Sequence, residues 1–231
     1  MDVDFTAELA AARVMAVIRG TDGAAAIATG AALLETGLRF VEVALTTPGA
    51  LQAIETLRSV APTGSLVGAG TVLTASAVAD VAAAGAQFVV TPAVLESVPE
   101  AARRGLPVAA GALTPTEVHT ARQLGACVVK LFPASLGGPA YLKALRDPFP
   151  DIAFVAVGGV GPDDVRAYLD AGAIAVGVGG PLIGDAASGG SLSGLRVRAR
   201  TYVALTESYR RPPSGAERSP RSSGRNRAEP A

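Results

Sequence analysis

The hydrophobic positions of the chain form short apolar runs that alternate with longer stretches rich in alanine and leucine. Short runs of β-branched residues predict buried strands, and longer stretches with helical spacing of apolar positions predict helices. Strands are predicted at residues 14–18, 40–45, 65–69, 88–91, 107–110, 127–132, 153–157 and 173–178. Helices are predicted at residues 24–36, 50–60, 76–84, 95–104, 115–124, 139–146, 162–171 and 192–208.

This alternation favours parallel strands joined by helical crossovers, because each crossover returns the chain to the same edge of a sheet. Eight such units within residues 1–210 indicate a single α/β domain, a (β/α)₈ TIM barrel. An open doubly wound sheet is the alternative, but VIRGTDG follows the first strand, where a dinucleotide-binding sheet has GxGxxG. Left-handed caps are predicted where glycines end five of the helices: Gly37, Gly85, Gly105, Gly125 and Gly172.

Composition narrows the class of protein. Apolar residues are 49% and charged residues 17%, so the chain can bury a large core. No apolar run reaches the roughly 18 residues of a membrane helix, and the acidic start MDVDFTAELAA does not read as a signal peptide. The single cysteine, Cys127, fits a reducing, cytoplasmic setting. With one histidine, His119, neither a His-rich metal site nor a Ser-His-Asp triad is expected, and we predict no cofactor.

Charge is unevenly distributed, although the totals balance at 20 and 20. Residues 211–231 contain almost no apolar side chains and are predicted to be a disordered tail. From Tyr209 onward there are six arginines and two glutamates, so the remainder of the chain is net negative and has no general field for nucleic acid. The tail could be an RNA-binding arm, but a solvated tail without a role in the chemistry is the simpler interpretation.

Two charged residues interrupt apolar strands. Glu42 lies in FVEVAL and Lys130 in CVVKLF, on the second and the sixth predicted strands. Strands four apart in a ring of eight are opposite each other, so both side chains can face one another across the lumen. A buried charge must be paired or must titrate to its neutral form.

Desolvation of Lys130 would lower the pKa of its amine and make it a nucleophile toward carbonyls. The resulting imine accepts electrons when a neighbouring C–C bond breaks, and a carboxylate such as Glu42 can carry the proton. A structural ion pair is the alternative interpretation of the same two residues. Only one other lysine occurs, Lys143, and its helical context predicts a solvated position.

Glycine pairs follow the seventh and eighth strands, in VGGVGP and VGVGGPLIG. In barrels the loops after these two strands commonly hold a phosphate on backbone N–H groups. The predicted phosphate-binding residues are Gly158, Gly159, Gly179 and Gly180, and tight turns without a ligand are the alternative.

Other strand ends carry polar residues that could line the same rim. Arg19 ends the first strand, Gly70 and Thr71 follow the third, and Thr46 and Thr91 follow the second and fourth. The Thr71 hydroxyl could bind a carboxylate, whereas any of these threonines could instead cap the next helix.

Taken together, AVIRG, VEVALTTP, VGAGTVL, VVTP, KLFPAS, VGGV and AVGVG make residues 13–183 resemble the 2-keto-3-deoxy-6-phosphogluconate and 4-hydroxy-2-oxoglutarate aldolases. This resemblance implies a homotrimeric barrel that acts on a small keto acid. It implies that Lys130 forms the Schiff base and that Glu42 is the acid/base. The implied substrate-binding residues are Arg19, Thr46, Gly70, Thr71, Pro92, Phe132 and Val157.

Two departures bear on the substrate. Val157 in AVGG stands where the gluconate-type enzymes often have a threonine, which resembles the 6-phosphogalactonate branch. Pro181 stands where the family usually has a serine in the phosphate turn, so 4-hydroxy-2-oxoglutarate is also a candidate substrate. Two further hypotheses remain at this stage: a phosphosugar isomerase or thiamin-phosphate-type synthase, and a non-catalytic barrel that senses sugar phosphates.

Overall fold

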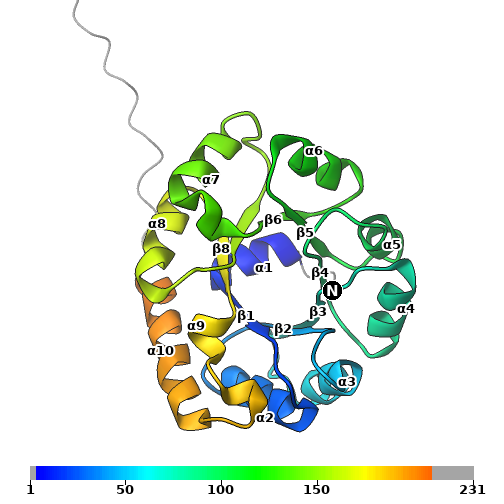
Figure 1. Cartoon of the computed structure of the whole chain (residues 1–231), viewed down its shortest axis with the longest axis vertical. Coiled ribbons are helices and arrows are strands. Elements are labelled where there is room, and N and C mark those ends of the chain that lie inside the picture. Colours follow the sequence, from blue (N-terminus) through cyan, green and yellow to red (C-terminus); the bar gives the residue numbers. More distant parts are fainter. Residues whose placement is uncertain (1–3, 210–231) are drawn as a thin grey trace, which may run out of the picture.

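The computed structural model describes residues 4–209, and the predicted tail at 211–231 lies outside this range. Its strands form a closed parallel barrel in which each strand pairs with the next and β8 pairs with β1 (Figure 1). Closure confirms the (β/α)₈ prediction and excludes the open sheet. The strands are β1 (Val14–Ile18), β2 (Phe40–Ala44), β3 (Leu66–Gly70), β4 (Val89–Val90), β5 (Val108–Ala112), β6 (Val128–Leu131), β7 (Phe154–Val157) and β8 (Ala175–Val178).

Helices surround the strands on the outside (Figure 1). The α-helices are α1 (Phe5–Ala12), α2 (Gly23–Glu35), α3 (Ala50–Val60), α4 (Ala75–Ala83), α5 (Ser97–Arg103), α6 (Pro115–Gln123), α7 (Gly138–Arg146), α8 (Val165–Asp170), α9 (Gly180–Ile183) and α10 (Leu192–Ser208). Short 3₁₀ turns occur at η1 (Ala134–Leu136), η2 (Pro162–Asp164) and η3 (Ala186–Ser188). All eight predicted helices are present; those at residues 50–60 and 192–208 have the predicted ends, and the ends of the other six are shifted. All five predicted glycine caps have a positive φ.

Successive strand residues alternate between the lumen and the helical layer. On β6, Val129 and Leu131 pack with the helices, whereas Val128 belongs to a separate cluster that fills the lumen. Because side chains alternate along a strand, Lys130 shares the inward direction of Val128. By the same rule, Glu42 on β2 shares the inward direction of Phe40.

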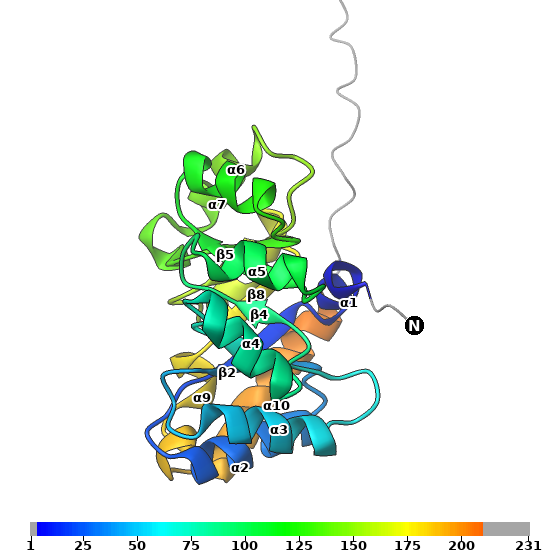
Figure 2. The ribbon, with the colours of Figure 1, turned by 90° about the vertical axis from the view of Figure 1, so that its right-hand side faces the viewer.

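Helix α1, which the sequence pattern did not predict, closes one end of the barrel (Figure 2). Asp4 caps it by accepting a hydrogen bond from the Ala7 amide at 3.1 Å. The ring of Phe5 lies with its centroid 5.8 Å from that of Phe40 and 5.2 Å from that of Phe88. These aromatic contacts fill the lumen at the N-terminal ends of the strands, so any cavity for a ligand must lie toward the other end.

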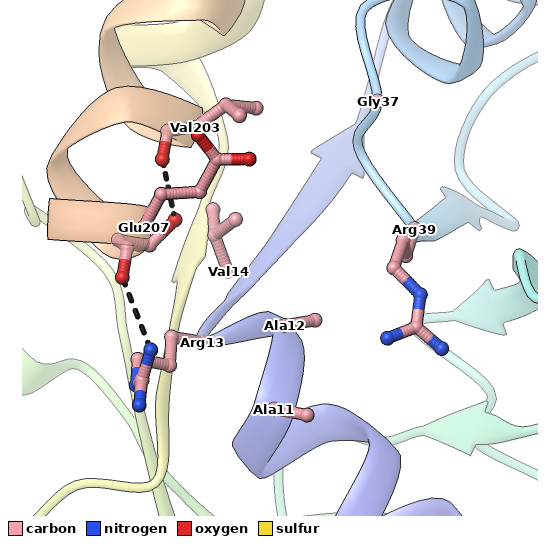
Figure 3. Close-up of a pocket in the computed structure, with 9 residues that line it drawn as sticks. Ala11, Ala12, Arg13, Val14, Gly37, Arg39, Val203 and Glu207 are labelled. Carbon is pink, nitrogen blue, oxygen red and sulfur yellow. Dashed lines mark hydrogen bonds between the residues drawn. The ribbon is translucent and has the colours of Figure 1, made fainter. Parts of the chain in front are cut away.

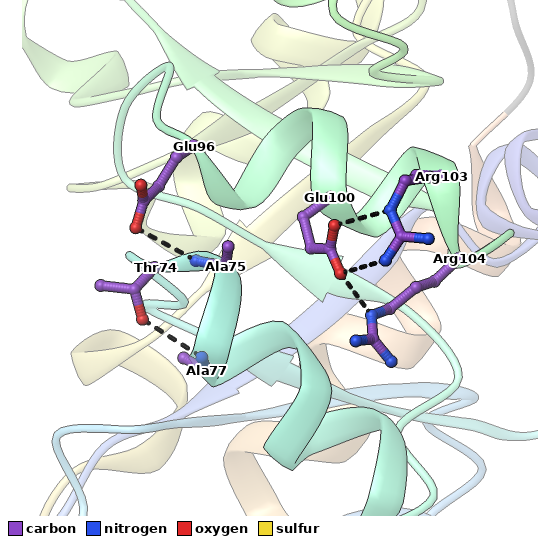
Figure 4. Close-up of polar contacts among 7 residues, drawn as sticks. All are labelled: Thr74, Ala75, Ala77, Glu96, Glu100, Arg103 and Arg104. Carbon is purple, nitrogen blue, oxygen red and sulfur yellow. Dashed lines mark hydrogen bonds and ion pairs between the residues drawn. The ribbon is translucent and has the colours of Figure 1, made fainter.

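Local contacts of polar side chains define the ends of the outer helices (Figure 4). Thr74 caps α4 through the Ala77 amide at 3.1 Å, and on α5 the Glu100 carboxylate binds two arginines, Arg103 and Arg104. These arginines hold the pKa of Glu100 well below its usual range, at about 2. Within residues 4–209, no helix combines the length and apolar character needed to cross a bilayer.

Candidate active site

The lumen contains two buried ionisable side chains at mid-depth. Glu42 is 1% exposed and Lys130 is 6% exposed, and their strands lie four positions apart in the ring of eight. Each interacts electrostatically with the other and with Arg19. Strand counting therefore predicted the relative placement of the two residues correctly.

The electrostatics of these two groups are dominated by loss of water. Burial raises the pKa of Glu42 above its ordinary value, and the cations of Lys130 and Arg19 only partly oppose this effect. Burial also lowers the pKa of Lys130; Arg19 lowers it further, while Glu42 acts in the opposite direction. The Lys130 ammonium therefore loses its proton at a lower pH than that of an ordinary lysine.

The two groups do not neutralise each other by direct contact. Among the described residues, no ion pair within 4.0 Å joins the Lys130 ammonium to the Glu42 carboxylate. Oxygen Oε2 of Glu42 is buried and has no hydrogen-bond partner in the part of the chain that the structure describes. Nζ of Lys130 lies 4.7 Å from the centroid of the Phe132 ring. The lack of a direct contact disfavours the alternative of a structural ion pair, because such a pair would have satisfied both groups.

Inward-facing glycines create space around these charges. A Cβ atom on Gly70 would lie 2.5 Å from Oε1 of Glu42, and one on Gly177 would lie 2.7 Å from Cγ2 of Val157. Gly111, which pairs in register with Lys130, would place a Cβ 2.3 Å from the carbonyl of Pro92. Side chains at these positions would displace or fill the space beside the two charged groups.

Arg19 is held at the rim by the loop that follows β3. Its Nη2 donates a hydrogen bond to Oγ1 of Thr71 at 3.2 Å. Thr71 has φ 58°, a left-handed conformation that costs a non-glycine residue roughly 1–3 kcal/mol. Such strain persists where surrounding contacts fix it, and here it places a hydroxyl beside a guanidinium at the mouth of the lumen.

A cavity of about 200 Å³ opens from Lys130 toward the loops after β7 and β8. Its walls combine the amine, a guanidinium, an aromatic ring and backbone N–H groups of glycine turns. It is lined by Val17, Arg19, Lys130, Phe132, Val157, Gly158, Gly159, Val160, Gly177, Gly179, Gly180, Pro181, Ile183 and Gly184. Eight of the predicted site residues therefore surround one cavity: Arg19, Lys130, Phe132, Val157, Gly158, Gly159, Gly179 and Gly180.

The other predicted site residues lie around this cavity or apart from it. Glu42 and Gly70 contact each other deeper in the lumen, and Thr71 joins the group through Arg19. Pro92 packs beside Gly111. Thr46 is exposed and is not among the residues that line the cavity.

Several polar residues named from the sequence either stabilise the fold or lie on the surface, outside the site. Thr91 donates to the Ala93 carbonyl at 2.6 Å and accepts from the Gly111 amide at 3.2 Å, which fixes the turn after β4. His119 and Lys143 are exposed on their helices. Burial raises the pKa of the Cys127 thiol, which donates to the Val108 carbonyl at 3.3 Å, so this thiol is not activated.

Sequence reasoning missed Thr47, which is 2% exposed. Its Oγ1 accepts a hydrogen bond from the Gly20 amide at 3.2 Å, linking the loop after β2 to the residue that follows Arg19. The TTP motif pointed to this place, but the sequence offers no signal that separates Thr47 from Thr46.

Three other cavities in the described part of the chain lack this combination of groups. One of about 220 Å³ lies near α1 and α10, where Arg13 and Arg39 flank it (Figure 3). Arg13 donates to the Thr206 carbonyl at 3.1 Å, and Arg39 forms an ion pair with Glu8, so both guanidinium groups already have partners. Within residues 4–209, no cluster of three or more His, Cys, Asp or Glu side chains could hold a metal ion.

A closed parallel barrel with a desolvated lysine facing a carboxylate defines a class of barrel enzymes that can form imines. Comparison with known proteins narrows this class: the family model described as "KDPG and KHG aldolase" matches residues 5–189. This chain therefore belongs to the KDPG and KHG aldolase family, whose named members are carbon–carbon lyases.

Relatives within the family include both substrate branches. The chain is 38% identical over 170 residues to the 2-dehydro-3-deoxy-6-phosphogalactonate aldolase of Escherichia coli K12, covering 73% of this chain and 83% of that protein. It is 38% identical over 140 residues to the KHG/KDPG aldolase of the same organism, covering 60% and 65% of the two chains. The 2-keto-3-deoxy-6-phosphogluconate aldolase structure from Zymomonas mobilis superposes with a TM-score of 0.79 at 29% identity, covering 88% of this chain and 98% of that one.

Proposed function

We propose that this chain is a class I aldolase that cleaves a 2-keto-3-deoxy sugar acid through an imine on Lys130. The observation that carries the proposal is the buried Lys130 amine, which forms no ion pair within residues 4–209, has a lowered pKa and borders a cavity on the side of the barrel opposite the strand of Glu42. A neutral amine in this position attacks the C2 carbonyl, and loss of water from the adduct gives a protonated imine.

The imine then accepts electrons from the bond that breaks. Glu42 takes the proton of the C4 hydroxyl, the C3–C4 electron pair moves to C3 to form an enamine, and C4 leaves as an aldehyde. Return of a proton to C3 regenerates the imine, and water hydrolyses it to pyruvate and the free Lys130 amine. Glu42 suits both proton transfers for two reasons. Its Oε2, which lies in the lumen, has no hydrogen-bond partner among the described residues, and its pKa is raised toward neutral pH.

The remaining site residues bind the two ends of the substrate. Arg19 and the Gly70–Thr71 turn are suited to the carboxylate of the keto acid, and Phe132 and Pro92 form apolar walls beside the reacting carbons. Gly158, Gly159, Gly179 and Gly180 would bind a terminal phosphate through backbone N–H groups. The resemblance also implies Thr46 as a substrate-binding residue, and we include it on that ground. Its exposed loop would have to move toward the ligand for Thr46 to contact it.

The candidate substrates are the gluconate- and galactonate-derived 2-keto-3-deoxy-6-phosphates, which give pyruvate and glyceraldehyde 3-phosphate, and 4-hydroxy-2-oxoglutarate, which gives pyruvate and glyoxylate. The first would place the enzyme in an Entner–Doudoroff-type breakdown of sugar acids. Val157 and the longer match to the galactonate enzyme, which spans 170 residues against 140 for the KHG/KDPG aldolase at equal identity, favour the galactonate-derived substrate as the alternative to the gluconate-derived one. The 19% identity to a 3-hexulose-6-phosphate synthase is a likeness of fold alone and does not favour a synthase.

We further propose a homotrimer in the cytoplasm. A neighbour at 34% identity and a TM-score of 0.79 is a protein cage designed by fusing symmetric oligomeric domains, which supports assembly into an oligomer. The single cysteine fits a reducing compartment. Sedimentation of the purified chain tests the trimer.

Pyruvate release from each of the three substrates, coupled to lactate dehydrogenase, tests the function. Cleavage of at least one substrate without added metal supports the proposal, and the ratio of kcat/KM values identifies the preferred substrate. Failure of all three to release pyruvate would contradict it.

A further inference from the structure

Residues 179–184, which contain α9, form one wall of the cavity beside Lys130. Gly179, Gly180, Pro181, Ile183 and Gly184 all line it. The segment contacts β1, β8 and α10, and Figure 1 shows α9 next to α10. Its position relative to the lysine therefore determines the shape of the cavity at the end distant from the imine.

The segment has few hydrogen bonds of its own. The amides of Leu182 and Ile183 donate to the Gly179 carbonyl at 2.9 Å, and the Gly184 amide donates to the Gly180 carbonyl at 2.8 Å. A helix this short leaves its last carbonyls without partners inside the helix, and an isolated turn of this length is unstable in water. An external partner is needed to hold it in one position.

Arg198 on α10 is that partner. Its Nε donates to the Leu182 carbonyl at 2.8 Å and its Nη2 donates to the Ile183 carbonyl at 2.9 Å. Two donors of one planar guanidinium thus fix two consecutive carbonyls, which restricts both the place and the orientation of the turn. The fork is half-buried, and its helix is anchored by the buried side chains of Leu195 and Ala199.

Gly184 gives this guanidinium the space it needs. A Cβ atom at Gly184 would lie 2.5 Å from Nη2 of Arg198, and the residue has φ 57°, which disfavours a side chain. Gly184 and Arg198 therefore form one fitted contact, although the sequence places them on different elements.

We propose that Arg198 is a positioning residue that holds residues 179–184 in place and so sets the affinity for the phosphate end of the substrate. It does not take part in the imine chemistry, because its side chain is not among the residues that line the cavity. This inference rests on the proposed function for the identity of the substrate, and on the contacts above for the role of Arg198.

Arg198→Met removes both donors and keeps the length of the side chain, whereas Arg198→Lys retains one charged donor. Arg196→Met is the matched control, since Arg196 lies on the same helix and pairs with Glu35 at the surface, at 2.9 Å, away from the cavity wall. The readouts are KM and kcat for a phosphorylated keto acid and for unphosphorylated 4-hydroxy-2-oxoglutarate. Calorimetric binding of 3-phosphoglycerate and inorganic phosphate is measured in parallel, with thermal unfolding as a check on folding.

We expect Arg198→Met to raise KM for the phosphorylated substrate by about tenfold, the scale of a lost charged hydrogen bond, with kcat within about twofold. KM for the unphosphorylated substrate and all values for Arg196→Met should stay within about twofold. Arg198→Lys should fall between wild type and Arg198→Met. Binding of 3-phosphoglycerate should weaken in the same order.

Equal changes for both substrates, or no change in the phosphorylated one, would overturn the role of Arg198. If wild type cleaves no keto acid, the proposed function fails, but weaker 3-phosphoglycerate binding in Arg198→Met alone would still support the positioning role. Failure of wild type to bind either phosphate probe would overturn it.

Discussion

The two halves of the barrel lumen are built in opposite ways. Toward the N-terminal ends of the strands, Phe5, Phe40 and Phe88 pack ring against ring within the apolar cluster that fills the lumen. Toward the C-terminal ends, Glu42 and Lys130 stand among glycines and open into a cavity. One half buries apolar surface, which stabilises the fold, and the other keeps desolvated charges, which destabilise it but provide reactivity. The strands thus carry stability at one end and chemistry at the other.

The largest expected effect comes from removing the nucleophile in the open half. Lys130→Ala should lower turnover by at least about 10⁴-fold, the scale on which enzymes depend on their nucleophile. The assay is pyruvate release under saturating substrate. Lys143→Ala is the matched control, because Lys143 is exposed on α7, and its rate should be unchanged. Appreciable activity in Lys130→Ala would remove the imine from the mechanism.

Glu42→Gln should slow turnover by about 10²–10⁴-fold, the range for a lost acid/base group. The amide keeps the shape of the side chain but cannot carry the proton of the C4 hydroxyl. Steady-state kinetics test this, with Glu55→Gln on the exposed face of α3 as the control. A rate equal to wild type would exclude Glu42 from proton transfer.

Phe88→Ala tests the packed half and should cost about 3–5 kcal/mol of unfolding free energy, because a fully buried aromatic ring leaves a cavity. Urea unfolding measures it. Val197→Ala, at a position 64% exposed, should change stability by less than about 0.5 kcal/mol. At low temperature the folded Phe88→Ala chain should remain active. Loss of activity in the folded chain would show that the two halves are not separable.

The smallest effect is a gain of stability in an inactive chain. The double variant Glu42→Leu/Lys130→Met should be more stable than wild type at neutral pH by about 1–4 kcal/mol, as found when buried charged groups are replaced by hydrophobic residues of similar volume. Urea unfolding at several pH values tests this. A double variant less stable than wild type would mean that the two charges stabilise the fold.

The pH dependence of that gain follows from the two pKa shifts. The folded chain holds the Glu42 proton more tightly than the unfolded chain, so this residue costs stability as pH rises above its ordinary value of 4.5. The folded chain holds the Lys130 proton less tightly, so this residue costs stability as pH falls below 10.5. Both costs are present between these values, and the double variant should gain most there.

The barrel could be predicted from the sequence because buried parallel strands are apolar on both faces and the helices between them end at glycines. Helix α1 was missed, since its short alanine-rich sequence shows little periodicity and the helix is stabilised by packing of Phe5 and Leu9 into the lumen. Helix α9 was read as a glycine turn, because a four-residue helix containing proline has no pattern of its own.

The site was partly predictable for a related physical reason. Glu42 and Lys130 were conspicuous in the sequence, because burying a charge inside an apolar strand costs free energy. Arg198 was not, since an arginine on an amphipathic helix reads as a solvated residue until its contacts with another element are seen. Thr47 was missed because its buried partner, the Gly20 amide, belongs to a distant loop.

The most direct test is reductive trapping of pyruvate, followed by peptide mapping with mass spectrometry. Incubation with pyruvate and borohydride should add one reduced pyruvyl group to the peptide containing Lys130, and none to that containing Lys143. An unmodified peptide around Lys130, under conditions in which the enzyme is active, would contradict the account.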